Sequence, residues 1–160
     1  MTLTQQTLLN AFNYKDGVLY WKNPTSKSVK IGDTVGCNSN GYRLICINKQ
    51  FIHAHRAIFI MHHGYLPLIV DHIDGNKANN KIENLRQATK AENAWNSKIH
   101  KHNTSGIRGV SWNKQTSKWR AAINVNGKAL HLGRFNDIKD AENAVKLARQ
   151  TYHGQFARHQ

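Results

Sequence analysis

One stretch decides the fold of the first half of the chain: residues 70–86, VDHIDGNKANNKIENLR. Asp71 and His72 are adjacent at its start. A carboxylate is an oxygen ligand of the kind that Mg²⁺ and Mn²⁺ bind, and an imidazole can take a proton from water at neutral pH. Hydrolysis of a phosphodiester needs an activated water and stabilisation of charge on the phosphate and the leaving oxygen. The pair therefore predicts a metal-assisted hydrolytic site.

A helix is predicted shortly after this stretch. Thr89 and Glu92 have the spacing of a capping box, so the helix should begin at about Lys90. Asn93 then lies in its first turn, where a side-chain carbonyl oxygen could face a metal held by Asp71.

Asn84 lies in the connection between the His72 strand and this helix. From there its amide could hold the imidazole in one tautomer and one orientation. Other Asp and Asn residues of the stretch are expected to make ordinary turns and caps rather than to bind a ligand: Asp74, Asn76, Asn79 and Asn80.

The full pattern is Asp-His, then 11 residues, Asn, then 8 residues and a second Asn. It resembles the HNH homing-endonuclease family, whose catalytic unit is a ββα-metal fold around one divalent cation. The resemblance implies that Asp71 and Asn93 hold the metal, Mg²⁺ or Mn²⁺. It also implies that His72 is the general base and that Asn84 orients it.

The segment His55-Arg56 matches the same family. Arg56 is expected either to contact a phosphate near the site or to support the start of a helix. Several zinc-containing relatives brace this unit with four cysteines, but this chain has only Cys37 and Cys46 and no C-x-x-C pair. Packing from the N-terminal segment is therefore predicted to brace the unit.

Hydrophobic periodicity and turn residues predict the elements before residue 70. Cys46 lies in an apolar run and is expected to be buried. The predicted elements are a helix over 4–12, a strand over 17–21, a hairpin of strands 42–47 and 51–53, and a helix over 54–63 ended by Gly64.

The pattern changes after a polar, basic segment at 97–104, which is predicted to be a linker. Strands are expected over 109–112, 119–125 and 129–132, with a hairpin turn at Asn126-Gly127. A helix follows Asp137, with an apolar stripe that includes Tyr152. Residues 105–157 resemble an AP2 domain, which lays a three-stranded antiparallel sheet into the DNA major groove with a helix packed behind.

Strand alternation separates the two faces of this sheet. Trp119, Ala121, Ile123 and Val125 are expected to face the helix, and Trp112 and Trp119 are interpreted as core residues. Arginine suits guanine and phosphate, and asparagine suits adenine. The predicted DNA contacts are Arg108, Ser111, Asn113, Arg120, Asn124, His131 and Arg134.

Composition agrees with a nucleic-acid partner, because 23 Lys and Arg against nine Asp and Glu give a net charge of +14. No apolar run is long enough to span a membrane, and the N-terminus lacks a signal-peptide pattern. We therefore expect a protein of the bacterial cytoplasm, from a phage or mobile element as the resemblance implies. Its predicted partner is double-stranded DNA, with neither a membrane nor a small-molecule cofactor.

The predicted fold class is α+β. It comprises a ββα-metal HNH domain over 1–96, the linker 97–104, and an AP2-like sheet packed on one helix over 105–160. The predicted function is metal-dependent cleavage of double-stranded DNA by nicking or double-strand cutting, as a monomer or a homodimer. Two alternatives remain: a DNA-binding regulator with a catalytically silent HNH fold, and an RNA-binding protein.

Overall fold

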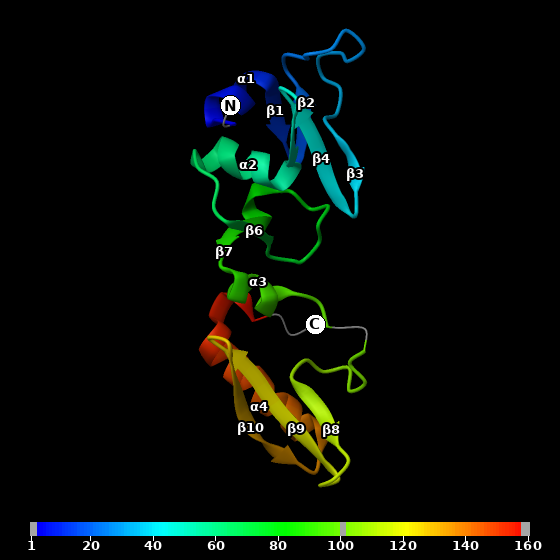
Figure 1. The fold of residues 1–160 in the computed structure, drawn as a ribbon, viewed down its shortest axis with the longest axis vertical. Helices are drawn as coiled ribbons and strands as arrows, with labels where there is room; N and C mark the ends of the chain where they lie inside the picture. The colour runs from blue at the N-terminus through cyan, green and yellow to red at the C-terminus, as the bar shows by residue number, and fades with distance from the viewer. Residues whose placement is uncertain (1–2, 100–101, 158–160) are drawn as a thin grey trace. The chain divides into compact units, whose positions relative to one another are not determined.

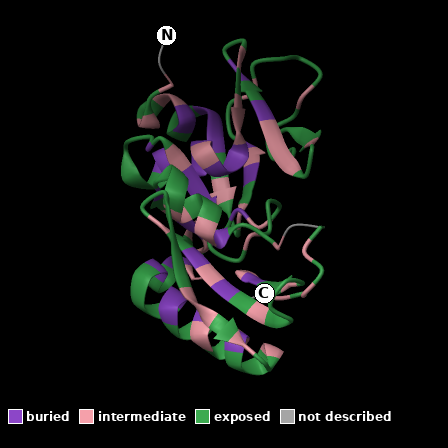
Figure 2. Cartoon of the chain, turned by 60° about the horizontal axis from the view of Figure 1, so that its bottom comes forward, coloured by how far each residue is buried: buried purple, intermediate pink, exposed green. Residues whose placement is uncertain are grey.

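The computed structural model describes residues 3–99 and 102–157 and divides the chain into two compact units, Met1–Ala88 and Thr89–Gln160 (Figure 1). Each unit has its own cluster of buried apolar side chains. Figure 2 shows buried residues within both units. The chain is a mixed α+β protein, as predicted. None of the helices in the described residues is long and apolar enough to cross a membrane.

The first unit combines short antiparallel strand pairs with two helices. Its elements, in chain order, are α1 (Gln5–Ala11), β1 (Phe12–Lys15), β2 (Val18–Trp21), β3 (Cys37–Ser39), β4 (Tyr42–Ile47), β5 (Gln50–His53), α2 (Ala54–His63), β6 (Ile69–His72), the 3₁₀ helix η1 (Ile82–Asn84) and β7 (Leu85–Ala88). β1 pairs with β2, β4 lies between β3 and β5, and β6 pairs with β7. The sequence did not predict β1 or β3, whereas the paired strands β6 and β7 correspond to the two strands of the ββα unit that the resemblance implied.

Capping and turn chemistry explain several boundaries in this unit. The Thr4 side chain accepts a hydrogen bond from the backbone N–H of Thr7 and caps α1, as predicted. Asn48 and Lys49 both have positive φ, 50° and 62°, which is the geometry of the tight turn that joins β4 to β5. α2 ends at Gly64, which adopts the left-handed conformation. In this conformation its backbone N–H donates a hydrogen bond to the carbonyl oxygen of Ile60.

The core of the first unit lies between α1, α2 and the strands, and includes Leu8, Phe12, Ile45, Ile47 and Ile58. Strand alternation buries Ile45 and Ile47 and turns Cys46 outward, so the prediction that Cys46 is buried was wrong. The predicted helix over 4–12 ends one residue earlier, since Phe12 begins β1.

The second unit is a meander of three strands packed on one long helix. Its elements are α3 (Lys90–Asn96), β8 (Val110–Asn113), β9 (Lys118–Val125), β10 (Lys128–Phe135), α4 (Ile138–His153) and the 3₁₀ helix η2 (Gly154–Phe156). β9 is the central strand and pairs antiparallel with both neighbours. Positive φ at Asn126 and Gly127 forms the predicted turn between β9 and β10.

The core of the second unit contains Val110, Ala121, Ile123, Ala141 and Val145. One face of α4 packs on the sheet, as its apolar stripe predicted. At the C-terminal end of that stripe the sequence was misleading: Tyr152 is half exposed, whereas Arg149 and His153 are buried. Trp119 is partly buried against this core, but Trp112 is 43% exposed and stands in an edge-to-face pair with Trp119.

The boundary between the two units falls before α3 because α3 packs against the end of α4 and η2. The segment 97–104 therefore lies inside the second unit, and its residues 100 and 101 lie outside the described residues. Its role as a linker between functional modules stays a prediction.

Candidate active site

Strand β6 carries Asp71 and His72, and both side chains are buried. The antiparallel partner β7 sets Arg86 opposite Asp71 and Leu85 opposite His72. Because neighbouring residues of a strand point to opposite faces, the carboxylate and the imidazole project to different sides of this hairpin.

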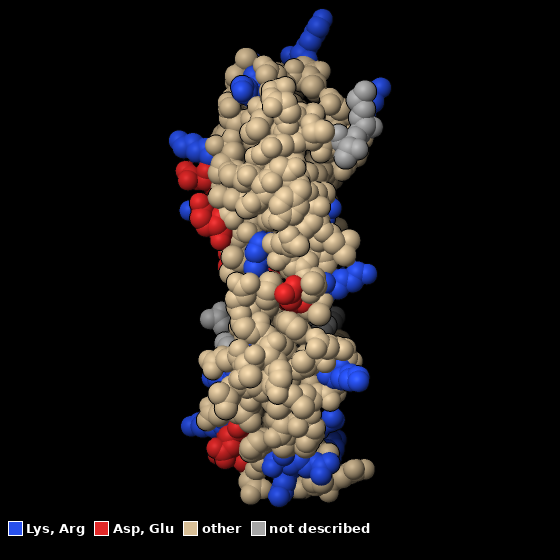
Figure 3. Space-filling view, turned by 90° about the vertical axis from the view of Figure 1, so that its left-hand side faces the viewer, with Lys and Arg blue, Asp and Glu red and all other residues tan. Residues whose placement is uncertain are grey.

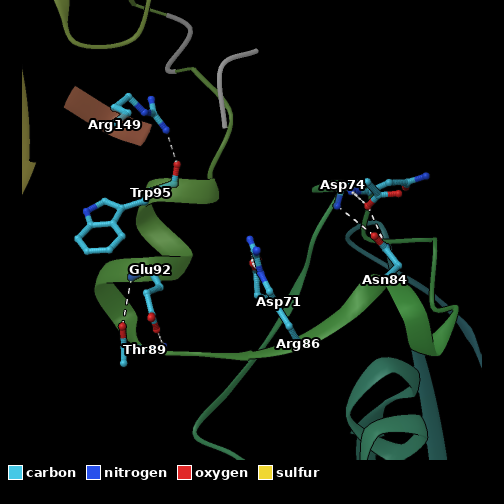
Figure 4. A network of polar contacts seen from close by, with 9 residues as sticks. Asp71, Asp74, Asn84, Arg86, Thr89, Glu92, Trp95 and Arg149 are labelled. Atoms are coloured by element: carbon cyan, nitrogen blue, oxygen red, sulfur yellow. Dashed lines mark hydrogen bonds and ion pairs between the residues drawn. The ribbon is translucent and has the colours of Figure 1, made fainter. Parts of the chain in front are cut away.

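The carboxylate of Asp71 forms an ion pair with Arg86. The Nε and Nη2 atoms of Arg86 lie 3.0 and 2.9 Å from Asp71 Oδ2. Figure 4 shows the two side chains lying together. A carboxylate in this position is stabilised only when it is paired, since an isolated buried charge is costly. Arg86, which the sequence did not single out, is therefore the charge partner of the buried Asp71 carboxylate.

The imidazole of His72 is held by Asn80. His72 Nε2 and Asn80 Oδ1 are 2.9 Å apart, and both residues are buried. An amide oxygen only accepts hydrogen bonds, so this contact places the proton on Nε2 and makes Nδ1 the basic nitrogen of the ring. The sequence predicted this orienting role for Asn84 and placed Asn80 among the turn residues.

Asn84 instead braces the loop that follows β6. Its side-chain oxygen accepts from the backbone N–H of Asp74, and its amide nitrogen donates to Asp74 Oδ1 and to the carbonyl oxygen of Asn79 (Figure 4). Burial alone would raise the pKa of Asp74, but hydrogen bonds from Asn76, Asn79 and Asn84 lower it on balance. The loop is thus organised around an ionised Asp74.

Aromatic rings enclose His72 from the side of β4, β5 and α2. The ring centroid of His55 is 4.9 Å from that of His72, and Tyr42 is 6.2 Å from it. His53 stacks on His55 at 5.5 Å. Burial lowers the pKa of His55 to about 3, with smaller contributions from His72, His53 and Arg56, so His55 is a neutral packing partner at physiological pH.

The N-terminal segment contacts the same loop at two points. The Tyr14 hydroxyl accepts a hydrogen bond of 2.9 Å from the backbone N–H of Ile82. Gly17 has φ +84°, and a Cβ atom there would lie 2.8 Å from the backbone nitrogen of Lys81. Only glycine permits this approach of the β1–β2 turn to the loop that carries Asn80.

Asn93 lies on α3 and is exposed, in the second unit. The predicted capping box is present: Thr89 Oγ1 accepts from the backbone N–H of Glu92, and the Glu92 carboxylate accepts from that of Thr89 (Figure 4). Asp71, His72 and Asn84 belong to the first unit. Within the described residues there is no cluster of three or more His, Cys, Asp or Glu side chains that could hold a metal by themselves.

Six of the seven predicted DNA contacts lie on one face of the second unit's sheet, opposite α4. In the strand register Ser111, Arg120 and Arg134 form one row, Asn113 is opposite Lys118, and Asn124 and His131 lie on the same face of neighbouring strands. The register of β10 shifts between His131 and Gly133. This bulge is needed for His131 and Arg134 to share a face, because strict alternation would separate them.

Two other arginines that the sequence predicted as DNA contacts, Arg108 and Arg56, have partners within the protein. Arg108 donates to the carbonyl oxygens of Ala94, Ser97 and Lys98 at the end of α3, rather than projecting from the sheet. Arg56 donates to the carbonyl oxygen of Leu68, 3.3 Å away, just before β6, and its expected phosphate contact stays a prediction.

Comparison with known proteins places this hairpin and helix in a family. Residues 53–95, from the end of β5 through α3, match the HNH endonuclease family model. The chain is 40% identical over 115 residues to "Protein 3.8" of Escherichia phage T7, covering 69% of this chain and 94% of that protein. It is 33% identical over 106 residues to an uncharacterized HNH endonuclease of Acanthamoeba polyphaga mimivirus, covering 64% of this chain and about half, 54%, of that protein. No solved structure matches the chain.

The chain therefore belongs to the HNH endonuclease family, as the sequence pattern predicted. Membership supports a nuclease that acts on DNA. The family match ends at residue 95, before the sheet of the second unit.

Proposed function

We propose that this protein is a divalent-metal-dependent endonuclease that hydrolyses phosphodiester bonds in double-stranded DNA. The observation that carries the proposal is the His72 imidazole, buried on β6 and fixed at Nε2 by Asn80, and preceded in the strand by Asp71, whose carboxylate is ion-paired. A general base needs a fixed ring and a defined tautomer, and this arrangement supplies both.

The reaction follows from that tautomer. His72 takes a proton at Nδ1 from a water molecule whose oxygen attacks the phosphorus atom. The bond from phosphorus to the leaving 3′ oxygen breaks, and that oxygen gains a proton from solvent. Asn80 keeps the ring in place throughout, since its oxygen accepts a hydrogen bond from Nε2–H in both the neutral and the protonated imidazole.

The proposed metal ligands are Asp71 and Asn93. Their donor set fits Mg²⁺ or Mn²⁺, because carboxylate and carboxamide oxygens are hard ligands. When bound, the cation would stabilise negative charge on the phosphate and the leaving oxygen. Arg86 pairs with Asp71 Oδ2 and holds this proposed ligand in place.

The second unit is proposed to bind DNA as AP2-like domains do, through the sheet face that carries Arg120, Asn124 and Arg134. The support is positional: these three side chains are exposed and share the face away from α4. Over the whole chain 23 Lys and Arg outnumber nine Asp and Glu, and Figure 3 shows clusters of basic side chains on one face of the molecule. Action in a bacterial host and a homing role are part of the same proposal, supported by the phage relative and by the sequence resemblance.

Cleavage of supercoiled plasmid tests the catalytic proposal. Wild-type protein should relax or linearise the plasmid in Mg²⁺ or Mn²⁺, and His72→Ala should bind DNA equally in a mobility-shift assay but lose cleavage. His102→Ala is the matched control because His102 is exposed and lies in the other unit. Added imidazole should partly restore cleavage by His72→Ala. Wild-type protein that binds DNA but leaves it intact in both metals would establish the silent regulator instead.

A second comparison tests the ligand and the substrate. Asp71→Ala should lose metal-dependent cleavage while retaining DNA binding, and loss of both would indicate a folding defect. Structured RNA should compete more weakly than duplex DNA for the protein at matched salt. Stronger competition by RNA would favour an RNA-binding protein.

A further inference from the structure

Helix α3 depends on the second unit for its stability. It has seven residues, and a helix of that length is marginal in water without tertiary packing. The capping box satisfies N–H groups at its first turn. At its other end, carbonyl groups need donors, because no following turn supplies them.

Two arginines supply those donors. Arg149, on α4, donates from Nη2 to the carbonyl oxygen of Trp95 at 2.9 Å (Figure 4). Arg108 donates to the carbonyl oxygens of Ala94 and Ser97. Cations at the C-terminal end of a helix also interact favourably with its dipole.

A stacked ring pair fixes the same end of α3. The rings of Trp95 and His153 are 4.1 Å apart and nearly parallel, with an interplanar angle of 11°. His153 Nε2 donates to the carbonyl oxygen of Asn124 at 2.9 Å. His153 thereby connects β9 of the sheet to α3 through two contacts.

Arg149 and His153 are polar residues, yet both are buried. Arg149 is only 2% exposed, on a face of α4 where an apolar residue would pack at lower cost. Burial lowers the pKa of Arg149 to about 10, with a further contribution from Arg108, so the guanidinium stays charged at neutral pH. Burial also lowers the pKa of His153, and its hydrogen bond to Asn124 only partly opposes this effect. The net lowering of the pKa favours the neutral ring. A buried charge directed at one carbonyl specifies where α3 sits.

We propose that Arg149, His153 and Trp95 form a lock, here called the α3 lock, that fixes α3 within the second unit and with it the direction of Asn93, the proposed metal ligand. This inference rests on the proposed function. Trp95 is two residues from Asn93 on α3, so a helix fixed at Trp95 presents the exposed Asn93 side chain in one direction. The three lock residues are positioning residues, since they act through α3.

The variant Arg149→Met tests the lock in the full-length protein, because Met keeps the length of the side chain and removes its donors. We expect the Mn²⁺ concentration for half-maximal plasmid cleavage to rise about tenfold, as for loss of partners that orient a metal ligand. Amide hydrogen exchange over 89–96 should be faster, with duplex DNA affinity unchanged. Arg149→Lys should recover part of the loss. Lys139→Met, on an exposed position of α4, is the matched control.

A double-mutant cycle with Asn93→Ala separates positioning from general stability. If Arg149 acts through Asn93, the double variant should cleave no more slowly than Asn93→Ala alone. If the two substitutions reduce the cleavage rate by independent factors that multiply, the lock is refuted. It is also refuted if the wild-type protein cleaves and Arg149→Met needs the same Mn²⁺ concentration as the wild type. Wild-type protein that does not cleave in either metal refutes the proposed function itself and removes this inference with it.

Discussion

The contact between His72 and Asn80 gives the sharpest test of the candidate site. Asn80→Ala removes the oxygen that accepts the proton of His72 Nε2 at 2.9 Å. Both residues are buried, at 5% exposure each, so water replaces the lost partner poorly. Leaving a buried donor unsatisfied costs about 1–3 kcal/mol. We therefore expect the free energy of unfolding of the first unit to fall by about 2 kcal/mol, and the protein to remain folded.

The effect on cleavage should be larger than the effect on folding. Without Asn80 the imidazole loses its fixed tautomer, and loss of such an orienting partner typically lowers activity about 10- to 100-fold. The assay is the single-turnover cleavage rate of a labelled duplex in saturating Mn²⁺, with DNA affinity measured in parallel. Asn143→Ala, an exposed position of α4, serves as the control.

Asn84→Ala provides the comparison that can refute this reasoning. Asn84 makes three hydrogen bonds to the loop and none of them is to His72, so its loss should lower the melting temperature with a smaller effect on the rate. If Asn80→Ala cleaves at the wild-type rate and Asn84→Ala does not, the orienting role belongs to Asn84, as the sequence alone predicted.

Three further perturbations have definite expected outcomes. Arg86→Met takes the guanidinium from the buried Asp71 carboxylate, and chemical denaturation should show a loss of about 3 kcal/mol. The pKa of His55 is about 3 in the folded protein against an ordinary 6.5, so stability should fall by up to about 1.4 kcal/mol per unit as the pH drops from 6.5 towards 3. His55→Leu should flatten that slope in urea titrations between these pH values, and an unchanged slope would contradict the assignment. Arg120→Ala should reduce the slope of log affinity against log salt by about one if Arg120 contacts a phosphate, as binding isotherms at several salt concentrations can show.

Local signals in the sequence predicted the elements whose causes are local. The helix at 54–63, the turn at Asn48-Lys49 and the capping box at Thr89 each depend on residues within a few positions of one another, and each is present. Membership of the HNH family was also predictable, because the resemblance rested on the spacing of Asp71, His72, Asn84 and Asn93, and all four lie within the matched residues 53–95.

The sequence could not predict contacts that depend on packing between distant segments. Asn79 and Asn80 are equivalent in a sequence pattern, yet only Asn80 is buried against His72, where the β1–β2 turn presses on the loop. Arg149 lies beside the apolar stripe of α4, and its burial depends on α3, which precedes it by 53 or more positions. The bulge in β10 likewise has no signal beyond Gly133.

The basic side chains of the second unit fall into two groups, one on the sheet face proposed to bind DNA and one with partners inside the protein. Arg120 and Arg134 extend from the open face of the sheet, where neutralised phosphates would release counterions. Arg108 and Arg149 point at carbonyl groups at the end of α3, and their charge stabilises a helix. A count of basic residues therefore overestimates the number of DNA contacts, and salt dependence measures only the first group. Substitutions in the second group should change metal dependence and helix protection while leaving the salt slope unaltered, because they alter the helix that carries Asn93 and not the surface proposed to meet DNA.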